Sequence, residues 1–258
     1  MMDLVEIFPA FLLVFVRVTS FFLMMPLFSY RTVPTTFKVG FGFFLAVIMF
    51  IEMDAPALEI DGVYYLLIIK EALIGILLGF IAYLIMSAIQ TAGGFIDFQM
   101  GFGMVNVMDP QTGAQSPLMG QYLNIISLFF LLMVNGHHLI IDGIYYSYQF
   151  IPLDQAWLPL GSEHLLQYVL KSFSTMFLIA LQMSLPVVGC LFLVDVALGI
   201  TARTFPQLNI FVVGIPLKIG VSLVILMVVM STMMAVVSQI FETMLTTMRG
   251  LLHLFGGL

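Results

Sequence analysis

Long apolar runs separated by short polar stretches dominate the pattern of this chain. Residues 72–96, 110–141, 172–194 and 219–241 contain no Asp, Glu, Lys or Arg. A helix that crosses a bilayer needs about 20 mostly apolar residues. Each of these four runs therefore predicts a membrane-spanning helix.

Two further apolar runs near the N-terminus are less regular. Residues 4–28 are long enough for a span but contain Arg17 in mid-run, and residues 39–53 are short, with Gly40 and Gly42 at their start. Together with the four stronger runs they predict about six long apolar helices. The stretches between runs contain charges, Pro or Gly and predict loops over 29–38, 52–62 and 152–164.

Composition strengthens the membrane interpretation. Of the 258 residues, 62% are hydrophobic and 9% are charged, whereas soluble domains usually carry roughly 25% charged residues. A soluble protein of this length could not bury so much apolar surface in one core. No linker or low-complexity tract divides the chain. We therefore expect an all-α integral membrane protein with a single domain over residues 1–258.

Charge and cysteine content exclude several classes of function. The formal net charge is −6, with eight Lys and Arg in total and no basic run, so binding to a nucleic-acid backbone is not expected. The single cysteine, Cys190, excludes an internal disulfide and a cysteine-based metal cluster.

The stretch from Gly93 to Pro117 departs from a plain helix bundle. It is rich in Gly and Pro, which favour irregular backbone, but it also carries bulky apolar residues. Irregular backbone at membrane depth is tolerated where protein or a water-filled cavity surrounds it. The pattern fits either an ordinary amphipathic surface loop or a plug that closes a pore. The predicted plug residues are Gly101, Phe102, Gly103, Met104, Val105, Asn106, Met108, Asp109 and Pro110.

Charged residues within or beside the apolar runs form a second departure. Charges inside a membrane are expensive and usually face a partner, a cavity or an interface. We expect buried or interfacial roles for Arg17, Lys70, Glu71, Asp195, Arg203 and Lys218. For Lys70 and Arg203 the alternative is that each side chain snorkels to a lipid headgroup from a helix end.

Three prolines interrupt hydrophobic runs. Pro186, Pro206 and Pro216 are each predicted to break or kink a helix. Kinked helices rich in small residues pack against neighbouring helices more often than they lie alone in lipid.

Catalytic and metal-binding motifs are missing from the sequence. It contains no P-loop, no nucleophile elbow and no GxGxxG motif. His137 and His138 are adjacent, and adjacent side chains on a helix diverge by about 100°, so a shared metal ion is not expected. We expect no enzyme activity, no metal and no cofactor.

Several sequence blocks resemble the FliR family of flagellar export proteins and its virulence type III secretion counterparts. The most specific block is the stretch 204–218, TFPQLNIFVVGIPLK. Further blocks follow the family's order and cover nearly the whole chain: Arg17, Pro26-Leu27-Phe28, Val33-Pro34, Lys38, Lys70-Glu71 with Gly75 and Gly79, Gly93-Gly94 to Gly101, Asp109-Pro110, and Asn135-Gly136-His137-His138.

The resemblance implies more than composition can. It implies kinked helical hairpins in a multi-pass protein of the bacterial cytoplasmic (inner) membrane, within the flagellar basal body. It implies a core pore subunit of the flagellar type III export gate, assembled with FliP-like and FliQ-like subunits. FlhB-like and FlhA-like components and unfolded flagellar substrate proteins are the other implied partners, besides the lipid bilayer. The family's plug corresponds to residues 101–117, and buried charges would be satisfied at subunit contacts.

Two other functions remain open at this point. A virulence type III secretion paralogue would carry the same blocks. A secondary transporter for a small solute also uses broken helices and charges near the bilayer midplane, although most transporters contain internal repeats and none is evident here.

Overall fold

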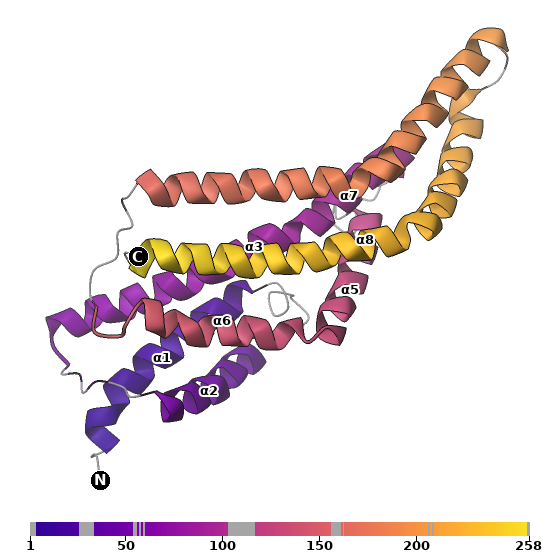
Figure 1. Cartoon of the computed structure of the whole chain (residues 1–258). Coiled ribbons are helices and arrows are strands. Elements are labelled where there is room, and N and C mark those ends of the chain that lie inside the picture. Colours follow the sequence, from indigo (N-terminus) through magenta and orange to yellow (C-terminus); the bar gives the residue numbers. More distant parts are fainter. Residues whose placement is uncertain are drawn as a thin grey trace. The chain divides into compact units, whose positions relative to one another are not determined.

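Helices account for nearly all of the chain that the structure describes. The computed structural model describes residues 4–25, 34–53, 56, 58, 60–102, 117–155, 161, 163–205, 207 and 209–256. No strand occurs in these ranges, which confirms the predicted all-α class. The long helices in them are α1 (Leu4–Met24), α2 (Thr35–Glu52), α3 (Gly62–Met100), α5 (Leu118–Met133), α6 (Gly136–Phe150), α7 (Glu163–Thr204) and α8 (Ile210–Gly256) (Figure 1).

Five of these helices, α1, α2, α3, α7 and α8, are long and apolar enough to cross a membrane. The number rises to six if α5 and α6 count as one broken span. The expectation of about six apolar helices is therefore confirmed. Three helices are longer than the charge-free runs that predicted them. Helices α3, α7 and α8 have 39, 42 and 47 residues.

Two helices begin earlier than the charge pattern predicts. Helix α3 begins at Gly62 and includes Lys70 and Glu71, which the sequence suggests as the head of a run starting at 72. Helix α2 begins at Thr35 and includes Lys38. A charge ends an apolar run but not a helix, since Lys and Glu are good helix formers and their charges can be satisfied by tertiary partners.

The predicted run over 110–141 contains two helices instead of one. Helix α5 ends at Met133, and Asn135, with φ 55°, adopts the left-handed conformation before α6 begins at Gly136. Asn tolerates this conformation better than most residues with a Cβ. The Asn-Gly pair therefore ends one helix and starts the next.

The glycines at 93 and 94 do not produce irregular backbone, contrary to the prediction. Both lie inside α3, which continues to Met100. A Cβ added at Gly93 would overlap the backbone of Gly120 in α5. The absence of side chains thus permits close approach of two helices, which is the usual role of small residues in membrane helix packing.

Two of the three prolines that were predicted to break or kink a helix lie inside a continuous helix. Pro186 lies inside α7 and Pro216 inside α8, while Pro206 is outside the described residues. In a membrane, neighbouring groups can satisfy the backbone carbonyl that a proline frees, so a proline need not end the helix. Kinking at these positions stays a prediction.

The residues form two compact units. Unit 1 comprises Met1–Ile85, Asn135–Phe173 and Glu242–Leu258, and unit 2 comprises Met86–Val134 and Ser174–Phe241. Helices α3, α7 and α8 contribute to both, so a single domain over the whole chain stays a prediction. The core of unit 1 includes Leu13, Val14, Phe21, Ile74, Leu78 and Ile144, all fully buried. The core of unit 2 includes Ile89, Ala92, Ile96, Leu123, Val187 and Val237, also buried.

Candidate functional site

A buried ion pair joins α1 to α3 in unit 1. The guanidinium of Arg17 pairs with the carboxylate of Glu71 through Nε and Oε2, and its Nη2 donates to Oε1 at 2.9 Å. Both side chains have 0% exposure. Glycine at position 75 makes this approach possible, because a Cβ there would overlap Ser20 and the Arg17 carbonyl. The bidentate geometry matches the fork of Arg to a carboxylate.

The remaining donors of Arg17 are satisfied by α6 and the residue after it. Nη1 donates to Oγ of Ser147 at 3.0 Å, and Nη2 also donates to the carbonyl of Ile151 at 2.9 Å. The guanidinium carbon lies 4.0 Å from the centre of the Tyr148 ring, a cation–π geometry. One arginine therefore ties three helices of unit 1 together.

Lys70 extends this network to the chain that follows α6. Its Nζ lies 2.7 Å from Oε1 of Glu71 and donates to the carbonyls of Pro152 at 2.9 Å and Leu153 at 3.0 Å. The Lys70 side chain is 2% exposed, so it does not snorkel to a headgroup. We call Arg17, Glu71 and Lys70 the buried charge cluster.

The buried charge cluster corrects one implication of the family resemblance. Buried charges were expected to be satisfied at contacts with other subunits, but Arg17, Glu71 and Lys70 find their partners within this chain. The physical reason is that desolvating a charge is tolerated only when the site that surrounds it already supplies counter-charges and hydrogen bonds.

A second polar network lies in unit 2, where α3 ends. Lys218 of α8 forms an ion pair with Oδ1 of Asp195 in α7. Gln99 of α3 donates from Nε2 to Oδ2 of Asp195 at 2.7 Å, and its carbonyl accepts from Lys218 Nζ at 3.4 Å. We call Gln99, Asp195 and Lys218 the α3 end clamp, because they connect the last turn of α3 to α7 and α8.

The α3 end clamp is more accessible than the buried charge cluster. The side chain of Lys218 is 19% exposed and that of Asp195 is 36% exposed. A cation at the carboxyl end of a helix is favourable, because the last carbonyls lack intrahelical partners and carry partial negative charge. The clamp therefore holds the last turn of α3 to α7 and α8.

A third contact pins the start of α5 to α3. Oδ2 of Asp97 accepts a hydrogen bond from the backbone N–H of Met119 at 2.9 Å, which satisfies one of the free donors in the first turn of α5. Asp97 is 2% exposed. With the close contact of Gly93 and Gly120, it fixes the crossing of α3 and α5.

Other predicted site residues fall into two groups. Arg203 is exposed in the last turn of α7, and the described residues include no acidic partner for it. Among the predicted plug residues, Gly101 and Phe102 directly follow α3, and Gly101 has φ 91°. Plug residues from 103 to 110 lie outside the described part of the chain, so the plug stays a prediction.

Sequence reasoning missed four polar residues of these networks. Asp97 and Gln99 lie within the glycine-rich stretch 93–117, but two polar residues at this spacing give no distinctive signal by sequence. Ser147 and Tyr148 lie among several tyrosines, at 145, 146 and 148, and carry no distinctive signal by sequence. Their roles follow only from their contacts. Ser147 and Tyr148 contact Arg17, Gln99 contacts Asp195, and Asp97 accepts from the backbone of Met119.

Nothing in the described residues forms a metal centre. No group of three or more His, Cys, Asp or Glu that could hold an ion occurs among them. The rings of His137 and His138 lie 4.1 Å apart, yet no third ligand joins them in that part of the chain.

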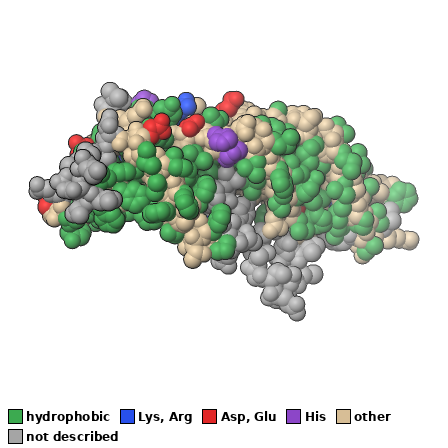
Figure 2. Space-filling model, turned by 90° about the horizontal axis from the view of Figure 1, so that it is seen from below, with side chains coloured by type: hydrophobic (Ala, Val, Ile, Leu, Met, Phe, Trp, Pro, Cys, Tyr) green, Lys and Arg blue, Asp and Glu red, His purple; other side chains and the backbone are tan. Residues whose placement is uncertain are grey.

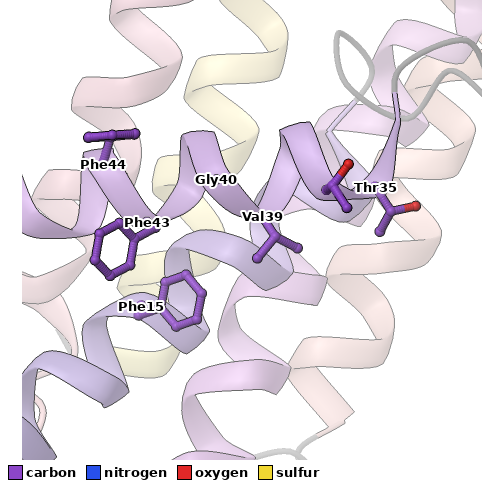
Figure 3. Close-up of a pocket in the computed structure, with 7 residues that line it drawn as sticks. Phe15, Thr35, Val39, Gly40, Phe43 and Phe44 are labelled. Carbon is purple, nitrogen blue, oxygen red and sulfur yellow. The ribbon is translucent and has the colours of Figure 1, made fainter.

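An apolar pocket of about 510 Å³ opens between α1 and α2 in unit 1 (Figure 3). Phe15 of α1 faces Phe43 of α2, with ring centres 5.9 Å apart. Gly40 leaves open space on the wall, and Thr35 and Thr36 supply the only hydroxyl groups in the lining. This pocket offers apolar contact and no reactive group.

Hydrophobic side chains cover much of the face seen in Figure 2. In α7 and α8 the exposed apolar residues include Leu181, Leu185, Phe192, Val224, Met227 and Val228. Apolar surface on this scale requires lipid or other protein around it. Long apolar helices and charges paired within the chain define a helical membrane protein.

Comparison with known proteins identifies the family to which this membrane protein belongs. Residues 8–244 match the family described as "Bacterial export proteins, family 1", and the chain belongs to that family. It is 57% identical to the flagellar biosynthetic protein FliR of Bacillus subtilis (strain 168) across 99% of both chains. It is 31% identical to FliR of Escherichia coli (strain K12), over 80% of this chain and 79% of that one.

A virulence protein is also similar, at a lower level. The Yop proteins translocation protein T of Yersinia pestis is 29% identical over 72% of this chain and 71% of that protein. The predicted resemblance to the FliR family is confirmed. With the apolar helices, the family also confirms the expected location in the bacterial inner membrane.

Proposed function

We propose that this chain is a core pore-forming subunit of the flagellar type III export gate. It assembles with FliP-like and FliQ-like membrane subunits and works with FlhB-like and FlhA-like components. The complex passes unfolded flagellar proteins across the cytoplasmic membrane. The observation that carries this proposal is the 57% identity to a flagellar biosynthetic protein along essentially the whole chain. The lower 29% identity to the Yersinia translocation protein favours the flagellar system over a virulence system.

The surface of α7 and α8 supports assembly with other membrane subunits. Little of the apolar window of α8 is buried within this chain, since the buried share is 17%, compared with 61% for α3. Membrane helices associate through van der Waals packing and close backbone approach, and Gly189, Gly199 and Gly220 leave open space on these helices. We propose that partner subunits pack on these helices, with lipid covering what remains.

The glycine-rich segment over residues 101–117 is proposed to close the pore at rest. Its sequence combines flexible glycines with bulky apolar side chains such as Phe102 and Met104, which suit a constriction that must seal and then open. Its flanks are firmly held, because Gln99 and Asp97 on α3 bond to α7, α8 and α5.

The assembly is tested by co-expression. The chain is produced alone and with FliP-like and FliQ-like subunits, and the native mass of each preparation is measured. We expect a defined hetero-oligomer with the partners. A stable solitary protein that accumulates a small solute in vesicles would instead support a secondary transporter and overturn the proposal.

The plug is tested on the assembled complex. Deleting residues 104–108 is expected to raise ion leak across the membrane while leaving the native mass of the complex unchanged apart from the deletion. Replacing Glu163, exposed in the first turn of α7, by Gln provides a control that should leave leak at the parental level. Unchanged leak in a correctly assembled deletion variant would contradict the plug assignment.

A further inference from the structure

Asp97 carries an unpaired oxygen inside the crossing of α3 and α5. The residue is 2% exposed. Its Oδ2 accepts a hydrogen bond from the backbone N–H of Met119 at 2.9 Å, but its Oδ1 is buried and has no hydrogen-bond partner among the described residues. Most buried polar atoms in proteins are hydrogen-bonded. The unpaired oxygen of Asp97 therefore needs a physical reason.

No cation compensates the Asp97 carboxyl within the part of unit 2 that the structure describes. The other charged or titratable side chains in that part are Tyr122, Cys190, Asp195, Arg203 and Lys218. Asp195 and Lys218 pair with each other, and the other three are exposed. The groups that act on the Asp97 carboxyl are instead the backbone N–H groups of Met119 and Gly120 at the start of α5.

An ionised carboxylate at this place would be poorly compensated. Backbone N–H groups at the start of a helix favour an anion, but a carboxylate that has lost nearly all of its water also needs a counter-charge. Glu71 shows what this chain provides for a buried anion, since it lies beside both Arg17 and Lys70. Asp97 has no such cation in the described ranges, and a charge within an apolar helix is expensive. Its surroundings therefore favour the neutral carboxyl.

We propose that Asp97 is a proton-binding site in the crossing of α3 and α5. Oδ1, the oxygen without a partner, carries the proton, while Oδ2 accepts from Met119 and holds the start of α5. The neutral carboxyl stays buried near the close contact of Gly93 with Gly120. Loss of the proton would leave a charge without a counter-ion in this crossing, so proton binding is coupled to the packing of α3 on α5. The site does not depend on the proposed plug.

Infrared spectroscopy tests for the proton directly. Spectra of the purified full chain at neutral pH are compared between the parental protein and Asp97→Asn, whose side chain has nearly the same shape. We expect the parental spectrum to contain the C=O stretch of a protonated carboxyl that the variant lacks. Glu163→Gln, at the exposed start of α7, is the control and should remove a carboxylate band instead. Loss of a carboxylate band in Asp97→Asn would show that Asp97 is ionised and would overturn the proposal.

Hydrogen exchange at the start of α5 provides a second readout. Peptides covering residues 117–122 are followed in the parental chain, Asp97→Asn and Asp97→Leu. Asn keeps an uncharged acceptor for the N–H of Met119, so Asp97→Asn should exchange at close to the parental rate. Leu removes the acceptor and should accelerate exchange by about three- to tenfold, the factor for one net hydrogen bond.

Two outcomes of the exchange experiment count against the proton site. If Asp97→Asn accelerates exchange as much as Asp97→Leu, the negative charge holds α5 and the neutral carboxyl is wrong. If Asp97→Leu exchanges at the parental rate, Asp97 does not hold the start of α5, and the coupling of proton binding to helix packing is overturned.

Discussion

Arg17 and Glu71 lie 54 positions apart in sequence and form an ion pair with 0% side-chain exposure. The pair joins α1 to α3, and the other donors of Arg17 reach Ser147 and Ile151. Breaking one partner of such a pair leaves a buried charge without compensation, which typically destabilises a protein by about 3–5 kcal/mol.

We therefore expect Glu71→Leu to lower the free energy of unfolding by about 3–5 kcal/mol. The measurement is the midpoint of detergent-induced unfolding of the purified chain. Glu163→Gln at the exposed start of α7 is the control and should change stability by about 0.5 kcal/mol or less. The combined Arg17→Leu and Glu71→Leu variant should lose less than the sum of its single changes, and strictly additive losses would contradict the role of the pair.

The contact of Gly93 with Gly120 predicts different outcomes for two neighbouring glycines. A Cβ at Gly93 would overlap the Gly120 backbone, whereas a Cβ at Gly94 would make an ordinary contact of 3.5 Å with Pro117. We expect Gly93→Ala to destabilise the chain by about 1–3 kcal/mol through overpacking. Gly94→Ala should be neutral or stabilising by up to about 1 kcal/mol, because Ala favours the helix. Equal effects of the two changes in the same unfolding assay would argue against the close crossing.

Lys70 holds the chain that follows α6 through two carbonyls. Lys70→Met removes the donors to Pro152 and Leu153, and hydrogen bonds to charged groups contribute about 1.5–3 kcal/mol each. We expect faster hydrogen exchange over residues 150–155 and a lower unfolding midpoint. Lys171→Met, at an exposed position of α7, is the control. Parental exchange rates in the Lys70 variant would show that these carbonyls do not depend on it.

Substitutions at Asn135 test how backbone conformation affects the stability of the chain. Its φ of 55° is in the left-handed region, which disfavours most residues with a Cβ by about 1–2 kcal/mol. Asn135→Gly should retain or slightly increase stability, while Asn135→Val should lower it by about that amount. Thermal unfolding of the two variants in one detergent checks the difference, and a Val variant as stable as the Gly variant would contradict it.

Much of the fold follows from patterns within short stretches of sequence. Apolar runs predicted the helices around α1, α2, α3, α7 and α8, since the length needed to cross a bilayer is a local property. Boundaries were less predictable. The run over 110–141 divides at Asn135, and α3 starts ten residues before its charge-free core. The reason is that capping groups and backbone conformation set the ends of a helix, whereas a charged residue does not.

The polar networks were predictable only in part. Arg17, Lys70, Glu71, Asp195 and Lys218 stood out because charges are rare in apolar runs. Their partners did not, since a glutamine or serine inside a helix carries no distinctive signal. Arg203 looked equivalent to Lys218 by sequence, yet it is exposed, while Lys218 pairs with Asp195.

The sequence by itself determined that this protein is a helical membrane protein of the FliR family, because hydropathy and the order of motifs are properties of the sequence that do not depend on tertiary contacts. The tertiary structure alone decided which charges meet. It paired Arg17 with Glu71 across 54 positions and placed Gln99 between α7 and α8. The physical reason is that a buried charge is stabilised by whatever groups folding brings within hydrogen-bond distance, and separation along the chain does not specify that distance.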